Sequence, residues 1–431
     1  MKRKNLIKLI QLISFFILLC CAYISCKKKK VNQRPSIEIL SPTEGATFNH
    51  NEEITVKIRA SDDVAITLIK VVINDLNSVA ITPSQSIVTQ LQNTDKSFVF
   101  KLSDANLKSG ELYISALISD GELETKKYLK INFNELPKSF TGFITGQESG
   151  SNTILNLYNA DNIKQNTFLF EGGNTKAAFI SAQQVFLGFG TNSNTKAIKL
   201  PELNQVWEYS ISLVKNITIK DDRFYLIKAD NYTTGYNASD FSVYKSFYEP
   251  SFTYFPECAA VGNNTLCAFQ MQPNLLTQKK IITYDINTSA ILKEFLTNNI
   301  IKSIIHINNE VFATHHINSN GQHQLGLYNF ENNLFSDIYT FGTNVKAILK
   351  IDANNILIYS DDGLGMYNFQ SNFYQLIINQ TAITSFDYDN LHNEIYLTRN
   401  NIVERFSTNG NLISSTNLDH QPQSITLLYN K

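Results

Sequence analysis

Alternating apolar and polar positions form two nearly identical phrases close to the C-terminal end of the chain. Gly-Leu-Tyr-Asn-Phe-Glu-Asn-Asn-Leu-Phe occupies positions 326 to 335, and Gly-Met-Tyr-Asn-Phe-Gln-Ser-Asn-Phe-Tyr occupies positions 365 to 374. Each phrase predicts a strand, a tight polar turn and the start of a second strand. The offset of 39 residues between the two phrases indicates a structural repeat.

The same pattern recurs, less well preserved, along most of the chain. Its anchors are Tyr158, Leu200, Tyr244, Tyr284, Tyr328, Tyr367 and Phe406. The spacings between successive anchors are 42, 44, 40, 44, 39 and 39 residues. A period close to forty is typical of four-stranded propeller blades. We therefore predict a seven-bladed β-propeller over residues 140–431, with the anchors on the third strands of the blades.

The last three blades divide into four strands each, and the first blade lacks one. The predicted strands are 300–308, 310–317, 324–330 and 334–341; 345–351, 356–360, 364–369 and 373–378; and 382–388, 394–398, 402–406 and 412–415. Before Tyr158 only residues 140–145 form a strand, so the first blade has no inner strand, whereas residues 424–429 remain unassigned at the other end. Because a propeller closes to remove its sheet edges, we predict that 424–429 completes the first blade.

Alternation with a period of two also dominates residues 35–134. Apolar positions are Ile54, Val56, Ile58 and Ala60, then Leu112, Ile114, Ala116 and Ile118. Turn signals at 41–45, at 61–63 and at Asp120-Gly121 separate the strands. Such a pattern favours an antiparallel sandwich of about seven short strands. Pro137 indicates a linker over 135–139.

Two resemblances support this all-β interpretation. The segment Pro-Ser-Ile-Glu-Ile-Leu-Ser-Pro-Thr-Glu-Gly-Ala-Thr-Phe at 35–48 resembles bacterial immunoglobulin-like and cadherin-like modules, which implies an immunoglobulin-like sandwich used as a spacer. We expect no calcium at Asp62-Asp63, because a fuller carboxylate set is missing there. The segment Ile-Thr-Tyr-Asp-Ile-Asn-Thr at 282–288 looks like the divergent YVTN-type propellers of bacterial envelopes. Trp207 is the only tryptophan, which excludes repeated Trp-Asp dipeptides.

Residues 1–25 are typical of an export signal. Its basic residues are Lys2, Arg3, Lys4 and Lys8. The apolar run that follows, 9–24, is short for a membrane span. Tyr-Ile-Ser-Cys at 23–26 resembles the cleavage box of bacterial lipoproteins, with Tyr23 in place of the usual Leu, which implies acylation of Cys26 and a tether over 26–34. The alternative is a signal-anchor helix.

The net charge and the absence of catalytic motifs argue against several classes of function. The formal net charge is −1 and only 17% of residues are charged, so we expect no nucleic-acid partner. The sequence contains no Gly-x-Ser-x-Gly, no His-Glu-x-x-His and no phosphate-binding glycine loop. We therefore predict no catalytic residues, no cofactor and no enzymatic activity.

Cys258 and Cys267 flank the turn Gly262-Asn263. A two-residue loop at that turn would make them directly opposed on neighbouring strands. Because an exported protein enters an oxidising compartment, the sequence predicts a disulfide there, with two buried free thiols as the alternative.

Histidines flank another turn, 318–321, where a four-residue loop would set His316 opposite His323, with His315 beside them. Two imidazoles on one face can begin a metal site, but no carboxylate or Cys partner lies nearby in the sequence. We therefore predict no metal.

Long loops predict a binding face. Connections from second to third strands share one face with blade-to-blade connections, and those at 229–240 and 270–279 are the longest. Loops on a rigid scaffold often carry binding residues. The predicted binding residues are Asn231, Tyr232, Tyr236, Asn237, Gln272, Asn274, His316 and His323.

These features together predict an outer-membrane lipoprotein of the cell envelope that is attached to the membrane through its N-terminal lipid. Its propeller would present a binding or assembly surface for a protein or glycan ligand. The sequence leaves two alternatives open: a glycan-active hydrolase or lyase acting in the propeller funnel, and a purely structural envelope component.

Overall fold

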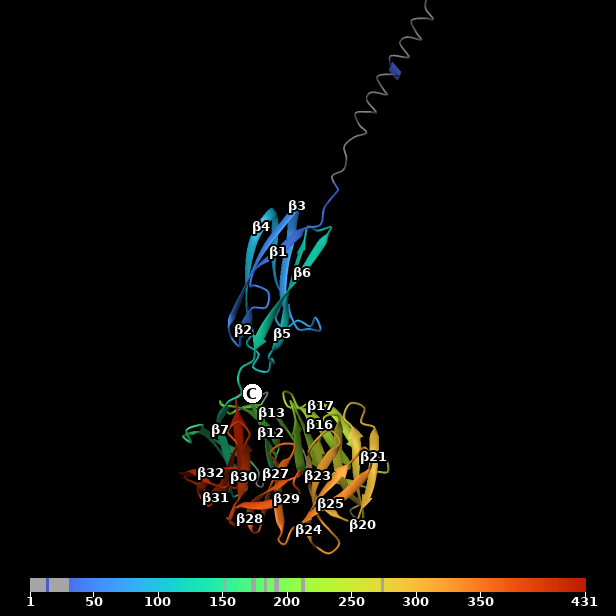
Figure 1. Cartoon of the computed structure of the whole chain (residues 1–431), viewed down its shortest axis with the longest axis vertical. Coiled ribbons are helices and arrows are strands. Elements are labelled where there is room, and N and C mark those ends of the chain that lie inside the picture. Colours follow the sequence, from blue (N-terminus) through green and yellow to red (C-terminus); the bar gives the residue numbers. More distant parts are fainter. Residues whose placement is uncertain are drawn as a thin grey trace, which may run out of the picture. The chain divides into compact units, whose positions relative to one another are not determined.

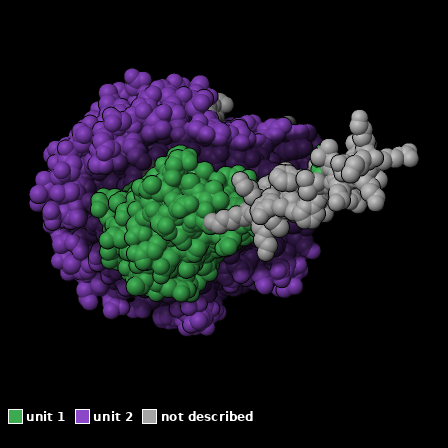
Figure 2. All heavy atoms as spheres, turned by 90° about the horizontal axis from the view of Figure 1, so that it is seen from above, with its two compact units in different colours: residues 1–136 green, residues 137–431 purple. Residues whose placement is uncertain are grey.

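The computed structural model describes residues 13–14, 31–150, 152–171, 176–181, 184–189, 194–210, 214–272 and 275–431. The predicted export signal, Cys26 and the start of the tether lie outside these ranges, as does Asn274. Within them, no helix has both the length and the apolar character that a membrane crossing requires. The chain divides into two compact units between Leu136 and Pro137, coloured separately in Figure 2.

The first unit is a β-sandwich of six described strands. They are β1 (Ser36–Ser41), β2 (Thr47–Asn49), β3 (Glu53–Asn74), β4 (Gln85–Lys101), β5 (Gly110–Ser119) and β6 (Glu124–Asn134). The strand order is β1-β3-β5-β6-β2, with β4 paired to β3. The N-terminal half of β3 pairs with β1, and its C-terminal half pairs with β5. One long strand therefore takes part in both layers.

The predicted turn at 61–63 is wrong, because β3 continues through it. The register with β4 shifts between Ser61 and Ile66 and again between Ile66 and Leu68, so the strand bends without ending. Inward positions change phase across this irregularity, from Ile54, Val56, Ile58 and Ala60 to Ile69, Val71 and Ile73. All of these side chains are buried, as are the predicted inward positions of β5.

The second unit is a β-propeller of four-stranded antiparallel sheets, which we call blades 1 to 7 (Figure 1). Blade 1 contains β34 (Ser424–Tyr429), β7 (Phe140–Ser149), β8 (Asn152–Asn159) and β9 (Lys164–Glu171). Blade 2 contains β10 (Lys176–Ile180), β11 (Val185–Phe189), β12 (Thr195–Lys199) and β13 (Asn204–Tyr209). Blade 3 contains β14 (Val214–Lys220), β15 (Arg223–Lys228), β16 (Tyr232–Asn237) and β17 (Val243–Tyr248).

The remaining blades follow the same inner-to-outer order. Blade 4 contains β18 (Phe255–Val261), β19 (Thr265–Gln272), β20 (Leu275–Asp285) and β21 (Ile291–Thr297). Blade 5 contains β22 (Ile300–His306), β23 (Val311–Ile317), β24 (His323–Asn329) and β25 (Leu334–Thr340). Blade 6 contains β26 (Val345–Lys350), β27 (Asn355–Ser360), β28 (Gly363–Asn368) and β29 (Phe373–Ile378). Blade 7 contains β30 (Ser385–Asp389), β31 (Glu394–Arg399), β32 (Ile402–Ser407) and β33 (Leu412–Asn417).

The ring closes as the sequence predicts. The C-terminal strand β34 pairs antiparallel with β7 and becomes the inner strand of blade 1. In the described residues, seven hydrophobic clusters each join two neighbouring blades, and one of them joins blade 7 to blade 1. Because both faces of a blade are covered, second strands such as β15 and β27 are buried along almost their whole length.

The repeated phrase has a packing reason. A Cβ at Gly326 would lie 2.7 Å from the Phe335 ring, and one at Gly365 would lie 2.4 Å from the Tyr374 ring, so an aromatic side chain of the outer strand covers each glycine. In the first copy the Tyr328 hydroxyl donates to Asn333 Oδ1 at 2.9 Å. Asn333 has a φ of +51°, a turn conformation that Asn tolerates better than most residues.

Candidate functional site

Strands in each blade run alternately between two faces of the propeller. Second-to-third-strand and blade-to-blade connections open on one face, the long-loop face, and the others open on the short-turn face. The two longest predicted loops are largely strand: β16 occupies Tyr232–Asn237, and β19 and β20 extend to Gln272 and from Leu275. Tyr244 therefore lies on the outer strand β17, although the repeat predicts it on a third strand.

The strand β16 is hard to recognise because its buried residues are small or polar. Thr233, Thr234 and Gly235 are all buried. A Cβ at Gly235 would lie 2.8 Å from the Tyr225 ring, so packing against that ring requires a glycine. Tyr236, a predicted binding residue, is only 6% exposed and belongs to the hydrophobic cluster between blades 2 and 3. The prediction for Tyr236 is therefore wrong.

The prediction that Asn237 lies on the long-loop face is also wrong. It ends β16 at the short-turn face, where its Nδ2 donates to Ser242 Oγ at 2.8 Å. Asn231 and Tyr232, at the other end of the strand, do reach the long-loop face. Of the binding residues predicted between 229 and 240, only Asn231 and Tyr232 therefore lie on the long-loop face.

Three aromatic rings gather on the long-loop face of blade 3. Tyr248 and Phe252 are stacked, with ring centroids 5.2 Å apart and planes 8° apart. The Tyr232 ring lies 5.6 Å from Tyr248 and 6.2 Å from Phe252. Tyr248 is 44% exposed and Phe252 is 49% exposed. We call Tyr232, Tyr248 and Phe252 the aromatic patch.

The loop that carries Phe252, residues 249–254, connects β17 to β18 and is held from both sides. Phe252 has a φ of +54°, which is rare for a bulky residue. Its backbone N–H donates to the Glu249 carbonyl at 3.0 Å. Its own carbonyl accepts a hydrogen bond from Asn231 Nδ2. Asn231, one of the predicted binding residues, therefore helps to position this loop.

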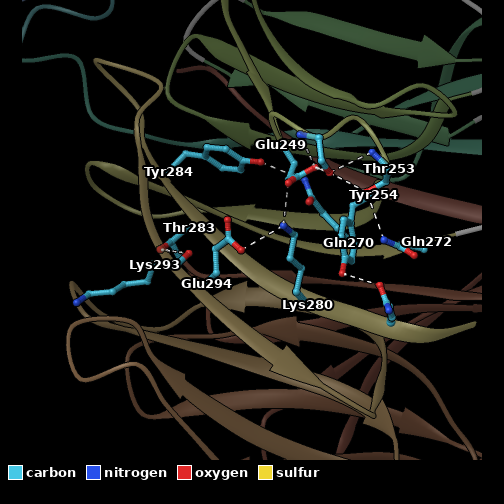
Figure 3. Close-up of polar contacts among 12 residues, drawn as sticks. Glu249, Thr253, Tyr254, Gln270, Gln272, Lys280, Thr283, Tyr284, Lys293 and Glu294 are labelled. Carbon is cyan, nitrogen blue, oxygen red and sulfur yellow. Dashed lines mark hydrogen bonds and ion pairs between the residues drawn. The ribbon is translucent and has the colours of Figure 1, made fainter. Parts of the chain in front are cut away.

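A buried ion cluster lies under this loop (Figure 3). The Lys280 side chain is 4% exposed, and its Nζ lies 3.2 Å from Glu294 Oε2 and 3.5 Å from Glu249 Oε1. The ammonium group also lies 4.2 Å from the centre of the Tyr254 ring. Glu249 in turn accepts hydrogen bonds from the backbone N–H and the hydroxyl of Ser251. Lys280 thus anchors both ends of the 249–254 loop.

Glutamines complete the cluster (Figure 3). Gln272 Nε2 donates to Thr253 Oγ1 at 3.3 Å, which places this predicted residue directly beside the loop. Gln270 is buried, and its Nε2 donates to the Tyr284 hydroxyl at 3.1 Å. Its amide oxygen is one of the buried polar atoms that have no hydrogen-bond partner in the described structure.

The sequence argument missed Phe252, Tyr248 and Lys280. The sequence did contain one local signal. In Glu-Pro-Ser-Phe-Thr-Tyr at 249–254, Phe252 stands among turn-forming residues that follow Pro250. The partners of Lys280 could not be found this way, because Glu249 and Glu294 lie 31 and 14 residues from it in the sequence.

Cys258 and Cys267 are two buried free thiols in the structure, so the predicted disulfide is wrong. Gly262 N–H bonds to the Thr265 carbonyl, which moves the turn by one residue to 263–264. Ala260 therefore faces Cys267, while Cys258 faces Phe269. Burial raises the pKa of the Cys258 thiol to about 12 and also raises the pKa of Cys267.

The histidines pair differently from the prediction. His316 faces Gln324 rather than His323 and is fully buried, with its Nε2 3.0 Å from Asp337 Oδ1. His315 Nε2 instead lies 2.9 Å from His323 Nδ1, and the Val345 N–H donates to that same His323 nitrogen at 3.1 Å. The hydrogen between the rings therefore belongs to His315 Nε2.

Burial lowers the pKa of His315 to about 3, so its ring is neutral at physiological pH. The contacts of His316 and His323 show that both side chains act in internal packing and hydrogen bonding. Across the described ranges, no set of three His, Cys, Asp or Glu side chains is arranged to hold a metal ion.

A third cluster, between blades 7 and 1, has the connectivity of a hydrolase triad. Thr145 Oγ1 lies 2.9 Å from His420 Nε2, and His420 Nδ1 lies 2.8 Å from Asp419 Oδ1. Contacts of Asp419 with His420 and Lys164 hold the pKa of its carboxyl at about 2. Thr145 is fully buried, so a substrate cannot reach its hydroxyl. The cluster fixes the loop between β33 and β34.

Comparisons with known proteins recognise the two units differently. Residues 35–116 match the family model for a Bacterial Ig domain. This match to the first unit is in keeping with a bacterial extracellular or envelope protein. No curated protein matches the chain.

Solved structures similar to this chain include a computationally designed protein, Ika8, with 10% identity and a TM-score of 0.47 over 67% of this chain and 91% of that one. The Neurospora crassa Pan2 WD40 domain has 9% identity and a TM-score of 0.47 over 58% of this chain and 80% of that one. The RRP9 WD40 repeats have 9% identity and a TM-score of 0.46 over 59% and 84%.

Proposed function

We propose that the chain is a lipid-anchored envelope protein whose propeller binds a protein partner through the aromatic patch. The observation that carries this proposal is Phe252, a half-exposed ring held at a positive φ in a loop pinned by Lys280 and Asn231. Strained, over-determined residues of this kind tend to occur at functional sites. Exposed, stacked aromatic side chains are typical anchors of protein interfaces.

Rigidity supports a binding role for this patch. A loop that is already ordered loses little conformational entropy when a partner docks, so more of the contact energy appears as affinity. The charged groups below the patch bind one another, with Lys280 between Glu249 and Glu294. We infer that they position the loop and do not act on a substrate, and that the protein functions by binding.

The anchoring part of the proposal rests on the sequence before the sandwich. The apolar run 9–24 is followed by Ser25 and Cys26, as in lipoprotein cleavage boxes. Acylation of Cys26 would attach the mature chain to a membrane, with the first unit between the lipid and the propeller along the chain. An outer-membrane location is part of this proposal.

The test of the binding site compares a double variant of the aromatic patch with a variant of an exposed phenylalanine on the opposite face. Phe252→Ala together with Tyr248→Ala removes most of the aromatic patch, whereas Phe373→Ala removes a ring that is 60% exposed at the short-turn face. Envelope proteins are captured with the wild-type chain, and the affinity of each captured protein is measured for both variants. We expect a loss of tenfold or more for the first variant only, because truncating an anchor residue costs about 2 kcal/mol. Equal affinity of both variants for every captured protein would exclude this site.

A further inference from the structure

A groove of about 580 Å³ lies at the junction of blades 2 and 3, apart from the aromatic patch. We propose that it is a binding subsite for a neutral oligosaccharide of hexopyranose units, with the Tyr209 ring as its stacking platform. The groove is lined by Tyr209, Phe241 and polar groups that include Lys228, Asp240 and Ser242. Its size falls within the range of about 300 to 1,000 Å³ that is typical of ligand sites.

Three nearly parallel rings support the platform and form a column with it. Phe224 stacks on Tyr236 at 5.4 Å, Tyr236 on Phe241 at 4.3 Å, and Phe241 on Tyr209 at 4.4 Å, with interplanar angles of 19°, 18° and 16°. Phe241 thus covers one face of Tyr209, and the Trp207 ring lies 6.0 Å from Tyr209 at an interplanar angle of 52°. Tyr209 is nevertheless 47% exposed, so part of it remains accessible to a ligand.

The backbone fixes this column in place. Phe241 has a φ of +61°, a conformation that bulky residues rarely adopt, and its N–H donates to the Asn237 carbonyl at 3.0 Å. Trp207 Nε1 donates to the Ala238 carbonyl at 2.8 Å, which ties the loop of blade 3 to the outer strand of blade 2. The ring of Tyr209 is therefore ordered before any ligand arrives.

Polar groups of the same groove can form hydrogen bonds with the hydroxyl groups around a sugar ring. Asp240 Oδ1 accepts hydrogen bonds from the Ser242 N–H at 2.9 Å and from the Ser242 hydroxyl at 2.7 Å. These bonds hold the pKa of Asp240 below its usual value, so the group is a carboxylate at neutral pH. A carboxylate has lone pairs for further hydroxyl donors. Lys228, whose Nζ lies 3.0 Å from Asp230 Oδ2, supplies ammonium donors to the groove.

The combination fits a pyranose better than a protein side chain. The face of an aromatic ring is electron-rich and attracts the polarised C–H groups on one side of a pyranose. The hydroxyls around the sugar ring can then bond to Asp240, Ser242 and Lys228. An apolar protein side chain on Tyr209 would cover these charged groups without giving them hydrogen bonds, which is unfavourable.

The test uses the full-length chain and three probes: the hexasaccharides of β-1,4-linked glucose, α-1,4-linked glucose and β-1,4-linked N-acetylglucosamine. Binding is measured by calorimetry at up to about 10 mM, since a small site of this kind is expected to bind with a Kd near the millimolar range. We expect at least one probe to bind, tenfold or more weakly to Tyr209→Ala and with nearly unchanged affinity to Tyr209→Phe. Asp240→Asn should weaken the same probe.

Tyr248→Ala is the matched control, because it truncates an exposed tyrosine of the aromatic patch. It should leave sugar binding unchanged, so failure of the sugar site and failure of the proposed protein site can be told apart. The melting temperature of Tyr209→Ala should stay close to that of the wild type, since the ring is at the surface. Absence of binding by all three hexasaccharides, equal binding by Tyr209→Ala, or an equal loss in Tyr248→Ala would each overturn the proposal.

Discussion

At Phe252 the chain holds a bulky residue at a φ of +54°, a conformation that costs roughly 1 to 3 kcal/mol. The surrounding contacts offset this cost. Glu249 and Asn231 bond to the backbone on either side of the ring, and Lys280 holds Glu249 from below. Glu249 therefore contacts both groups: its carboxylate pairs with Lys280, and its carbonyl accepts from the Phe252 N–H, which connects the internal ion cluster to the proposed binding surface.

Lys280 should therefore control the stability of the propeller. In Lys280→Met the buried Glu249 carboxylate loses its cationic partner, and breaking a buried pair in this way costs about 3 to 5 kcal/mol. Lys280→Met combined with Glu249→Gln removes both charges of this pair and leaves only the Glu294 carboxylate, which is 43% exposed, so it should recover most of that loss. Urea unfolding of the two variants and the wild type measures the difference. Equal midpoints for the single and double variants would contradict the role assigned to this pair.

Single residues also show where sequence reasoning reached its limit. Tyr232 was predicted on the long-loop face as part of a loop over 229–240, and it reaches that face as the first residue of β16. Tyr236, only four residues later, was predicted as exposed although it packs in a column of rings. Nothing local distinguishes these two tyrosines, because the burial of Tyr236 depends on Phe224 and on Phe241 at a positive φ.

At the scale of elements, the closing strand β34 was predictable, because the first blade had only three strands and residues 424–429 belonged to no other blade. The register between β18 and β19 was not predictable. It depends on a turn displaced by one residue, which by itself shifts the partner of each cysteine by two positions. A shift of two positions keeps the same side chains on the same face, so the hydrophobic alternation does not reveal it.

Side chains of β30 hold β34 in addition to the pairing with β7. Ser385 Oγ accepts from the Ile425 N–H at 3.2 Å, and Asp387 Oδ2 accepts from the Leu427 N–H at 2.9 Å. Asp389 Oδ1 accepts from the Tyr429 hydroxyl at 3.1 Å. Alternate residues of the last blade therefore bond to alternate residues of the strand that closes the ring.

The contact of Asp387 makes closure dependent on pH. Burial raises the pKa of Asp387 to about 6, against the lowering effect of the Leu427 and Tyr388 N–H groups. The unfolded chain loses this proton near pH 4 and the folded chain near pH 6, so folding binds the proton between these values. The stability that this group contributes is complete below about pH 4 and is lost as the pH rises through about 6, by roughly 3 kcal/mol in total.

Asp387→Asn should remove this dependence while it keeps an acceptor for the Leu427 N–H. We expect the free energy of unfolding of the variant, relative to that of the wild type, to increase as the pH rises from about 4 to about 7. Denaturant unfolding at several pH values measures the difference between the two proteins, which cancels the contributions of the other carboxyl groups. A difference that stays constant over this range would show that Asp387 ionises at its ordinary pKa.

For the whole molecule, repeat spacing and alternation were sufficient to predict two all-β units, because both patterns extend over many residues. The propeller is also consistent in its packing, with a hydrophobic cluster between each pair of neighbouring blades in the described residues. The candidate site was less predictable, since the aromatic patch and the ion cluster combine side chains from the end of blade 3 with others from blade 4. Such contacts depend on how two blades pack and not on any local pattern.

The proposed location of the molecule rests on Cys26. Several acyl chains on one residue give stable membrane attachment, whereas a single chain is marginal. In a bacterial host, Cys26→Ser should leave the export signal uncleaved, because the lipoprotein box loses its cysteine, and incorporation of labelled palmitate should disappear. Globomycin should likewise leave the export signal of the wild type uncleaved, but the precursor should keep its palmitate label. Ser25→Ala keeps a small residue before Cys26 and serves as the control, which should be processed normally. A wild-type chain that keeps residues 1–25 and takes up no labelled palmitate would favour the signal-anchor helix, in which these residues hold the chain at the membrane.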